Sequence, residues 1–233
     1  AISSFAVSEA RSGFLEGVEL LFVTLGIAFL VFFLEKKEKG NFYLYLYAVS
    51  IGLAILSKYT AIFLIPSAFV VLVIYKKGLF GKNAFFIALA LLLLVLSPVV
   101  IYNIMMFWTR GHFDAAISSM LGTRPDDFSV ICCRSVDANV AKNFNTMALS
   151  MKQSFSISLL SAFALGYIAI ILRWIRRGVT PLTATVIIHS IFLAIMFLFG
   201  ELNSRYLGIG IPLFAILLSL TFEQAREFFR RYP

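Results

Sequence analysis

Charged residues are scarce in this sequence, and their scarcity indicates the class of protein. Asp, Glu, Lys and Arg make up 14% of the 233 residues, whereas hydrophobic residues make up 61%, and the mean hydropathy is +0.93. Because soluble domains carry about 25% charged residues, this composition excludes an ordinary soluble domain. It predicts a membrane protein.

Cysteine is almost absent, and several well-known catalytic motifs are missing. The two cysteines, Cys132 and Cys133, are neighbours, and Cα atoms about 3.8 Å apart are too close for an ordinary disulfide. The chain has no glycine-rich phosphate loop, no H-E-x-x-H and no serine elbow, so ATP hydrolysis and proteolysis have no support. We expect no cofactor. A divalent metal has only Glu16 and Glu19 in its favour, and the dipole at a helix start explains these carboxylates more simply.

Seven apolar segments are each close to the roughly 20 residues that a membrane span needs. They cover residues 14–34, 42–57, 60–75, 84–106, 154–172, 180–199 and 206–222. Lys58 is the only charge between Phe42 and Tyr75, and a single helix over these residues would be about 51 Å long, too long for a bilayer core of about 30 Å. The sequence therefore predicts an all-α polytopic bundle in which two short helices meet at "SKYT", with Lys58 at a tight turn near one membrane face.

The basic residues are distributed unevenly over the short connections, and this predicts an orientation. If the N-terminus is outside, twelve of the 20 basic residues face the cytoplasm. These twelve are Lys36, Lys37, Lys39, Lys76, Lys77, Lys82, Arg173, Arg176, Arg177, Arg226, Arg230 and Arg231. The positive-inside rule then places the start of this chain outside and its C-terminus in the cytoplasm. The net charge of +8 is explained by this orientation, so nucleic-acid binding need not be invoked.

One long polar stretch, residues 107–153, is predicted to lie on the extracytoplasmic side. Loops of this length are usually functional or disordered. Two patterns within it have helical spacing, one from Phe113 to Met120 and the other from Val140 to Met151. Amphipathic helices that lie on the outer leaflet fit both patterns. Packing helices of a small outer cap are an equally good alternative.

The polar residues that are candidates for a site are all predicted to lie on this same face. The candidate substrate-binding residues are Glu9, Arg11, Lys58, Tyr59, His112, Asp114, Arg205 and Tyr206. Basic side chains at an outer membrane boundary suit a phosphate whose lipid tail stays in the bilayer. A single such residue is equally well explained as an anchor that extends its charge to the interface, but the clustering favours a site.

Four stretches of the sequence, in this order, resemble the polytopic GT-C glycosyltransferases. They are "SEARSGFLEGVELLFVTLGIAFLVFF", "GLAILSKYTAIFLIP", "SPVVIYNIMMFWTRGHFD" and "RYLGIGIPLFAILLSL". The branch that they resemble includes the protein O-mannosyltransferases and the lipid A aminoarabinose transferases of the cell envelope. The G-L-A-x-L-[ST]-K pattern that ends at Lys58 is the most specific part, and the resemblance covers most of the chain as a single transmembrane domain.

The resemblance implies a sugar transferase that uses a polyprenyl-phosphate donor and acts on a lipid, glycan or protein acceptor outside the cytoplasm. It implies that Lys58 meets the lipid phosphate, that Arg205 lies in a similar position, and, less securely, that Glu9 and Arg11 match a family motif. The family's catalytic base is a carboxylate in the first outer loop. We expect this chain to be a piece of a longer protein that carries the base before residue 1, so no residue here is assigned as catalytic.

Two other functions remain open from the sequence. In a multi-span transporter or lipid flippase, Lys58, His189 and Arg205 would line a pathway, although the repeat symmetry typical of transporters is not visible. A polysaccharide ligase or polymerase would share the donor lipid but transfer whole glycans.

Overall fold

The computed structural model describes residues 16–36, 40–114, 117–118, 144–145, 148–149, 151–152, 157–199 and 209–231, and these are helices with short connections. The longer helices are α2 (Glu16–Glu35), α3 (Gly40–Ser57), α4 (Leu64–Tyr75), α5 (Asn83–Arg110), α8 (Ile157–Arg177), α9 (Pro181–Phe199) and α10 (Ile211–Arg231). Two 3-10 helices, η1 (Tyr59–Phe63) and η2 (Lys77–Leu79), connect α3 to α4 and α4 to α5. The all-α membrane bundle predicted from the sequence is confirmed, with one helix at each of the seven apolar segments.

Three of these helices are long and apolar enough to cross a membrane. They are α2 from Gly17, α3 and α5, whereas the helices of the other four apolar segments contain shorter apolar stretches within the described residues. These helices and their composition indicate an integral membrane protein.

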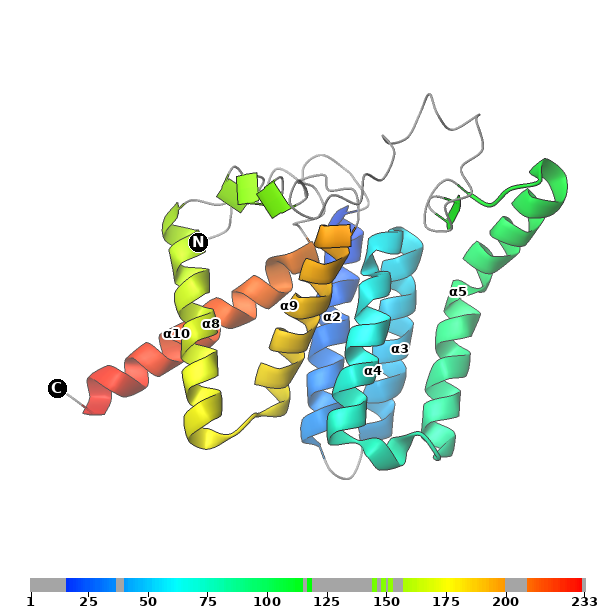
Figure 1. Ribbon diagram of the computed structural model, residues 1–233. Coiled ribbons are helices and arrows are strands. Elements are labelled where there is room, and N and C mark those ends of the chain that lie inside the picture. Colours follow the sequence, from blue (N-terminus) through cyan, green and yellow to red (C-terminus); the bar gives the residue numbers. More distant parts are fainter. Residues whose placement is uncertain are drawn as a thin grey trace.

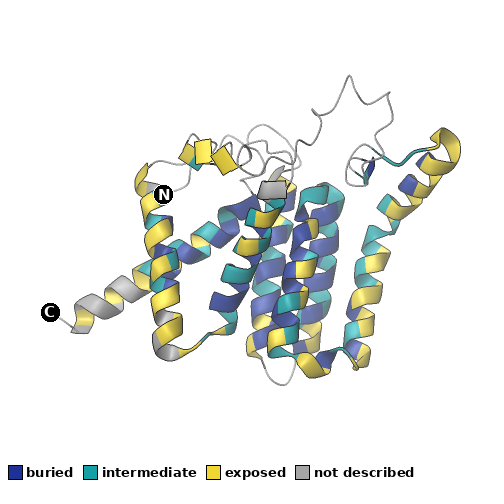
Figure 2. Cartoon of the chain, viewed as in Figure 1, coloured by how far each residue is buried: buried dark blue, intermediate teal, exposed yellow. Residues whose placement is uncertain are grey.

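The core lies between α2, α3, α4 and α9, and Figure 2 shows buried residues concentrated there. Small residues allow two of the contacts to be close, as is common between membrane helices. A Cβ atom on Gly26 of α2 would lie 2.5 Å from Ile51 Cδ1 of α3, and one on Gly52 of α3 would lie 2.7 Å from Val95 Cγ1 of α5. Beyond Val95, α5 exposes most of its apolar surface, and Figure 1 shows it leaning away from the other helices.

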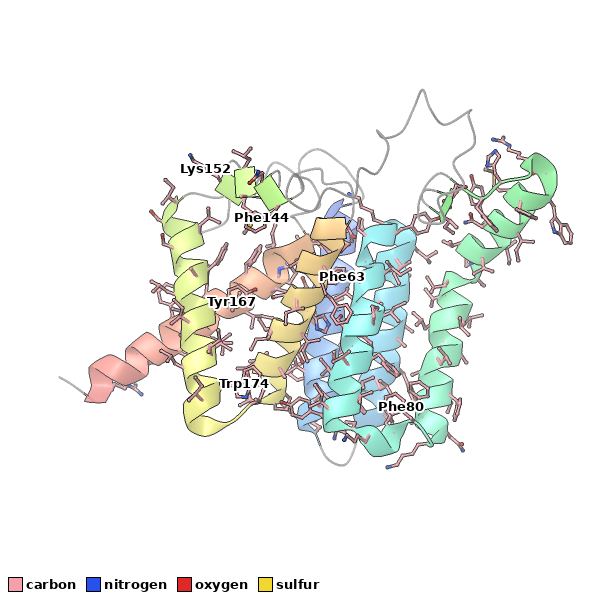
Figure 3. All side chains as sticks on the ribbon, viewed as in Figure 1. Phe63, Phe80, Phe144, Lys152, Tyr167 and Trp174 are labelled. Carbon is pink, nitrogen blue, oxygen red and sulfur yellow. The ribbon has the colours of Figure 1, made fainter. Side chains whose placement is uncertain are left out.

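The connections divide the bundle into two ends (Figure 1). The Lys58 end contains the α3–η1 junction, the end of α5 and the described residues between 111 and 152. The Lys76 end contains the short connections α2–α3, α4–α5 and α8–α9. Phe144 and Lys152 lie at the Lys58 end in Figure 3, and Phe80 and Trp174 lie at the Lys76 end. The predicted grouping of the lysine-rich connections 35–41 and 76–82 with the α8–α9 connection is therefore seen, since all three leave the helices at one end.

Helix α5 is longer than the predicted apolar segment. It continues to Arg110, so residues 107 to 110 belong to a helix and not to the loop predicted for 107–153. The helix ends at Gly111, whose φ of 75° is left-handed and whose N–H donates to Phe107 O. Glycine tolerates this conformation without a Cβ clash. Most of the two predicted amphipathic helices lies outside the described residues, so their interfacial role stays a prediction.

Candidate functional site

The α3–η1 junction places Lys58 at a break between two helices, as the sequence predicts. Helix α3 ends at Ser57, and Lys58 is extended, with φ −163° and ψ 131°. Its N–H still donates to Ala54 O at 2.9 Å, and its carbonyl accepts a hydrogen bond from Ala61 N at 3.2 Å. Lys58 and Tyr59 are both partly exposed. The break therefore presents a lysine and a tyrosine at the Lys58 end of the bundle.

Thr60 connects this break to α2. Its hydroxyl donates a hydrogen bond to Glu19 Oε1, although the two residues are 41 positions apart. Glu19 is only 3% exposed, and burying a carboxyl group is costly unless it is hydrogen-bonded. The contact therefore satisfies a buried acid in the first turn of a membrane helix, and it fixes the start of η1 against α2.

Tyr59 connects the same break to the chain that follows α5. Its phenol donates to Asp114 Oδ2 at 2.6 Å. Asn103, a buried residue of α5, donates to the same oxygen through Nδ2 at 2.9 Å. Asn103 Oδ1 also accepts a hydrogen bond from Asp114 N at 2.9 Å. Asp114 is thus held by an amide on one side and by a phenol on the other.

The residues after α5 turn back along it and bring Asp114 to this position. We refer to residues 111–114 and 117–118 as the return segment. Phe113 stacks on Phe107 with ring centroids 5.0 Å apart. Asp114 Oδ1 accepts a hydrogen bond from Ile117 N at 2.9 Å, in the manner of a helix N-cap. Ser118 is buried and donates to Phe113 O at 2.9 Å. The return segment is therefore tied internally, to α5 and to Tyr59.

The environment of Tyr59 keeps its phenol protonated. Tyr59 precedes the apolar segment 60–75, and its desolvation raises its pKa to about 12. The hydrogen bond to Asp114 and the nearby carboxylate charge act in the same direction. At neutral pH the phenol is therefore a hydrogen-bond donor, as its contact with Asp114 requires.

The structure brings some of the eight predicted site residues together. Lys58 and Tyr59 are adjacent, and Asp114 is hydrogen-bonded to Tyr59. His112 belongs to the same return segment, and its ring Nδ1 lies 2.8 Å from Phe113 O. The remaining four, Glu9, Arg11, Arg205 and Tyr206, lie outside the described residues. Their place in the site stays a prediction.

Asn103, Thr60 and Glu19 complete this arrangement, although they were not predicted to be site residues. Asn103 could have been noticed as an amide within the apolar segment 84–106, whereas Glu19 was considered only as a weakly supported metal ligand at a helix start. No sequence pattern indicated that Glu19 would meet Thr60. Within the described residues, no three His, Cys, Asp or Glu side chains are grouped as metal ligands.

Comparison with known proteins supports the family resemblance for part of the chain. Residues 1–102 match the family described as dolichyl-phosphate-mannose-protein mannosyltransferase. Over these residues the chain is mannosyltransferase-like. The matched residues include Lys58 and Tyr59 and end before His112 and Asp114. No curated protein and no solved structure matches the chain.

The mannosyltransferase-like match supports a membrane glycosyltransferase of the GT-C type. Members of this family use polyprenyl-phosphate sugar donors and transfer the sugar to lipid or protein acceptors.

Proposed function

We propose that this chain acts in the transfer of a sugar from a polyprenyl-phosphate donor to an acceptor at the extracytoplasmic face. The observation that carries the proposal is the position of Lys58. It lies at a helix break within the family match, at the end of the bundle opposite the lysine-rich connections. The positive-inside rule assigns those connections to the cytoplasm, so Lys58 would face outward at the membrane boundary.

The chemistry proposed for Lys58 is stabilisation of the leaving group. The acceptor nucleophile forms a bond to the anomeric carbon while the bond from that carbon to the phosphate oxygen breaks. Polyprenyl phosphate then leaves with the electron pair. Because negative charge grows on the phosphate during this step, a lysine ammonium beside it binds the transition state more tightly than the ground state. We expect Arg205 to assist, and a general base, to which no residue of this chain is assigned, takes the acceptor's proton.

The proposed partners are an acceptor, which is a lipid, a glycan or a protein, and the surrounding membrane lipids. The return segment and the predicted loop 107–153 would lie over the site, where a lipid, glycan or protein acceptor would approach. Multi-span transport and glycan polymerisation remain as outcomes that a transfer assay distinguishes from single-sugar transfer.

Replacing Lys58 tests the proposal. In the full-length protein, Lys58→Met keeps much of the aliphatic stem and removes the charge, and we expect transfer to fall about 10- to 1000-fold. Lys58→Arg should retain part of the activity, because guanidinium carries the charge on a larger, planar group. Transfer from polyprenyl-phosphate mannose, at equal membrane abundance, is the measurement.

Lys36→Met is the matched control from the opposite end. Lys36 Nζ lies 3.3 Å from Tyr43 Oη and 5.2 Å from the centre of its ring, so this change also removes one ammonium beside an aromatic residue. We expect Lys36→Met to transfer sugar within about twofold of the parent, since exposed cation–π contacts contribute only about 0.5–1 kcal/mol. If Lys58→Met behaves like Lys36→Met, Lys58 is an interfacial anchor and the proposal is wrong.

A further inference from the structure

Three consecutive residues of the α3–η1 junction are connected to different parts of the molecule. Lys58 is the proposed phosphate ligand, Tyr59 is bonded to Asp114 after α5, and Thr60 is bonded to Glu19 in α2. Tyr59 and Asp114 are 55 positions apart. The residue that is proposed to meet the phosphate is therefore directly followed by a contact with the return segment.

We propose that Asp114 is a positioning residue, which acts through Tyr59 to couple the return segment to the phosphate site at Lys58. This inference rests on the function proposed above, because it needs a phosphate to bind at Lys58. It adds that occupation of the Lys58 site and ordering of the return segment favour each other, so that the donor lipid and the outer surface of the site are linked.

The hydrogen bonds of Asp114 show how the coupling would reach the return segment. Oδ1 accepts from Ile117 N within the return segment, and Oδ2 accepts from Asn103 Nδ2 on α5. These two bonds, with the bond from Asp114 N to Asn103 Oδ1, hold the carboxylate on α5. The Tyr59 phenol joins this assembly to the Lys58 junction. Hydrogen bonds to an ionised carboxylate are among the stronger ones. A shift of Lys58 and Tyr59 would therefore also shift the return segment.

Packing between helices does not replace the hydrogen bond between Tyr59 and Asp114. Helices α3 and α5 approach each other closely at Gly52 and Val95, eight positions before Asn103 along α5. Beyond Pro98, most α5 side chains up to Arg110 are exposed, and the buried exceptions are Asn103 and Met106. The upper part of α5 is thus poorly packed against α3, and the contact between Tyr59 and Asp114 bridges the two.

Tyr59→Phe tests the coupling with the smallest possible change, since it removes only the phenol oxygen. Tyr75→Phe is the matched control. Tyr75 lies at the opposite end of the bundle, and its phenol donates one hydrogen bond, to Val179 O at 3.2 Å. Both variants lose one phenol hydrogen bond from a tyrosine of the same η1–α4 unit, but only Tyr59→Phe removes a hydrogen bond to the return segment.

Hydrogen exchange of the peptide that contains residues 112–118 is the main measurement, made on the full-length protein with and without polyprenyl phosphate. In the parent and in Tyr75→Phe, we expect polyprenyl phosphate to slow exchange of this peptide. In Tyr59→Phe, exchange without lipid should be about tenfold faster, as expected for the loss of a hydrogen bond to a charged group. Added lipid should no longer slow it.

A double-mutant cycle separates coupling from general damage to the fold. In Asp114→Asn, the new amide group cannot accept a hydrogen bond at one of the two carboxylate positions, while the size of the side chain is kept. If both residues act through one bond, Tyr59→Phe combined with Asp114→Asn should change exchange no more than the stronger single variant. Additive effects would contradict a shared bond.

The failures of the two proposals are distinguishable. If Tyr59→Phe exchanges like the parent without lipid, or if lipid still slows its exchange, the coupling is overturned whatever the enzyme does. If the parent does not bind polyprenyl phosphate, the proposed function is overturned, and the positioning role of Asp114 with it. Hydrogen exchange without lipid then still decides whether the Tyr59–Asp114 contact orders the return segment.

Discussion

The two ends of the bundle use polar side chains in different ways. At the Lys58 end, hydrogen bonds join residues that are far apart in sequence, as from Tyr59 to Asp114 and from Thr60 to Glu19. At the Lys76 end, Tyr75 also donates to the distant Val179 O, but the lysines contact aromatic residues. Lys36 contacts the nearby Tyr43, and Lys76 lies over the ring of Phe33 at 5.5 Å. Lysines that lie over aromatic rings suit a membrane boundary without requiring a fixed geometry.

This difference favours the Lys58 end over the Lys76 end as the position of a functional site. A topogenic lysine needs only to stay in water, whereas a site needs side chains that neighbouring contacts hold in place. Lys77 and Lys82 are exposed, as expected for topogenic residues. The Lys58 junction has its next two residues fixed by separate elements, and it lies within the mannosyltransferase-like match. The basic residues at the two ends should therefore respond differently to the same substitution.

The comparison fails completely if the two ends do not face opposite sides of the membrane. In a background with Cys132→Ser and Cys133→Ser, we expect Lys152→Cys to react with an impermeant maleimide from outside and Gly78→Cys to react only from the cytoplasmic side. Both positions are exposed, so access to the reagent is not limited by packing. Labelling of Gly78→Cys from outside would reverse the orientation and remove Lys58 from the extracytoplasmic face.

A smaller effect should separate Thr60 from an ordinary membrane threonine. Thr60→Val removes the hydroxyl that donates to the buried Glu19, and we expect a loss of about 1.5–3 kcal/mol of stability. Thr24→Val is the control, because Thr24 donates only to Leu20 O in its own helix, at 2.7 Å. That change should stay within about 0.5 kcal/mol.

Thermal unfolding in detergent measures both threonine variants. A loss in Thr60→Val no larger than that in Thr24→Val would show that the Glu19 contact adds little. The Lys58 junction would then be fixed from the Asp114 side alone.

Much of the helical arrangement could be predicted from the sequence, because apolar length and charge are local properties. The break at "SKYT" followed from comparing helix length with bilayer thickness, and the structure places Lys58 between α3 and η1. The end of α5 was predicted too early, since an apolar pattern fades before a helix ends. Gly111, with its left-handed φ, is the actual stop.

The site could be predicted only as a set of residues at one end. Lys58, Tyr59 and Asp114 were each identified from their position beside an apolar segment. Their partners were not, because the contacts of Asp114 with Tyr59 and of Thr60 with Glu19 depend on how distant helices pack. Asn103 was read as part of an apolar span, since its role depends on the chain turning back after α5.

The most direct test of the account is to find where the donor phosphate binds. A polyprenyl phosphate with a photoreactive group beside the phosphate can be cross-linked to the full-length protein, and the labelled peptides can be identified by mass spectrometry. We predict labelling within residues 55–62 and within the return segment. Labelling confined to residues 36–40, 76–82 or 173–180, at the Lys76 end, would contradict the account.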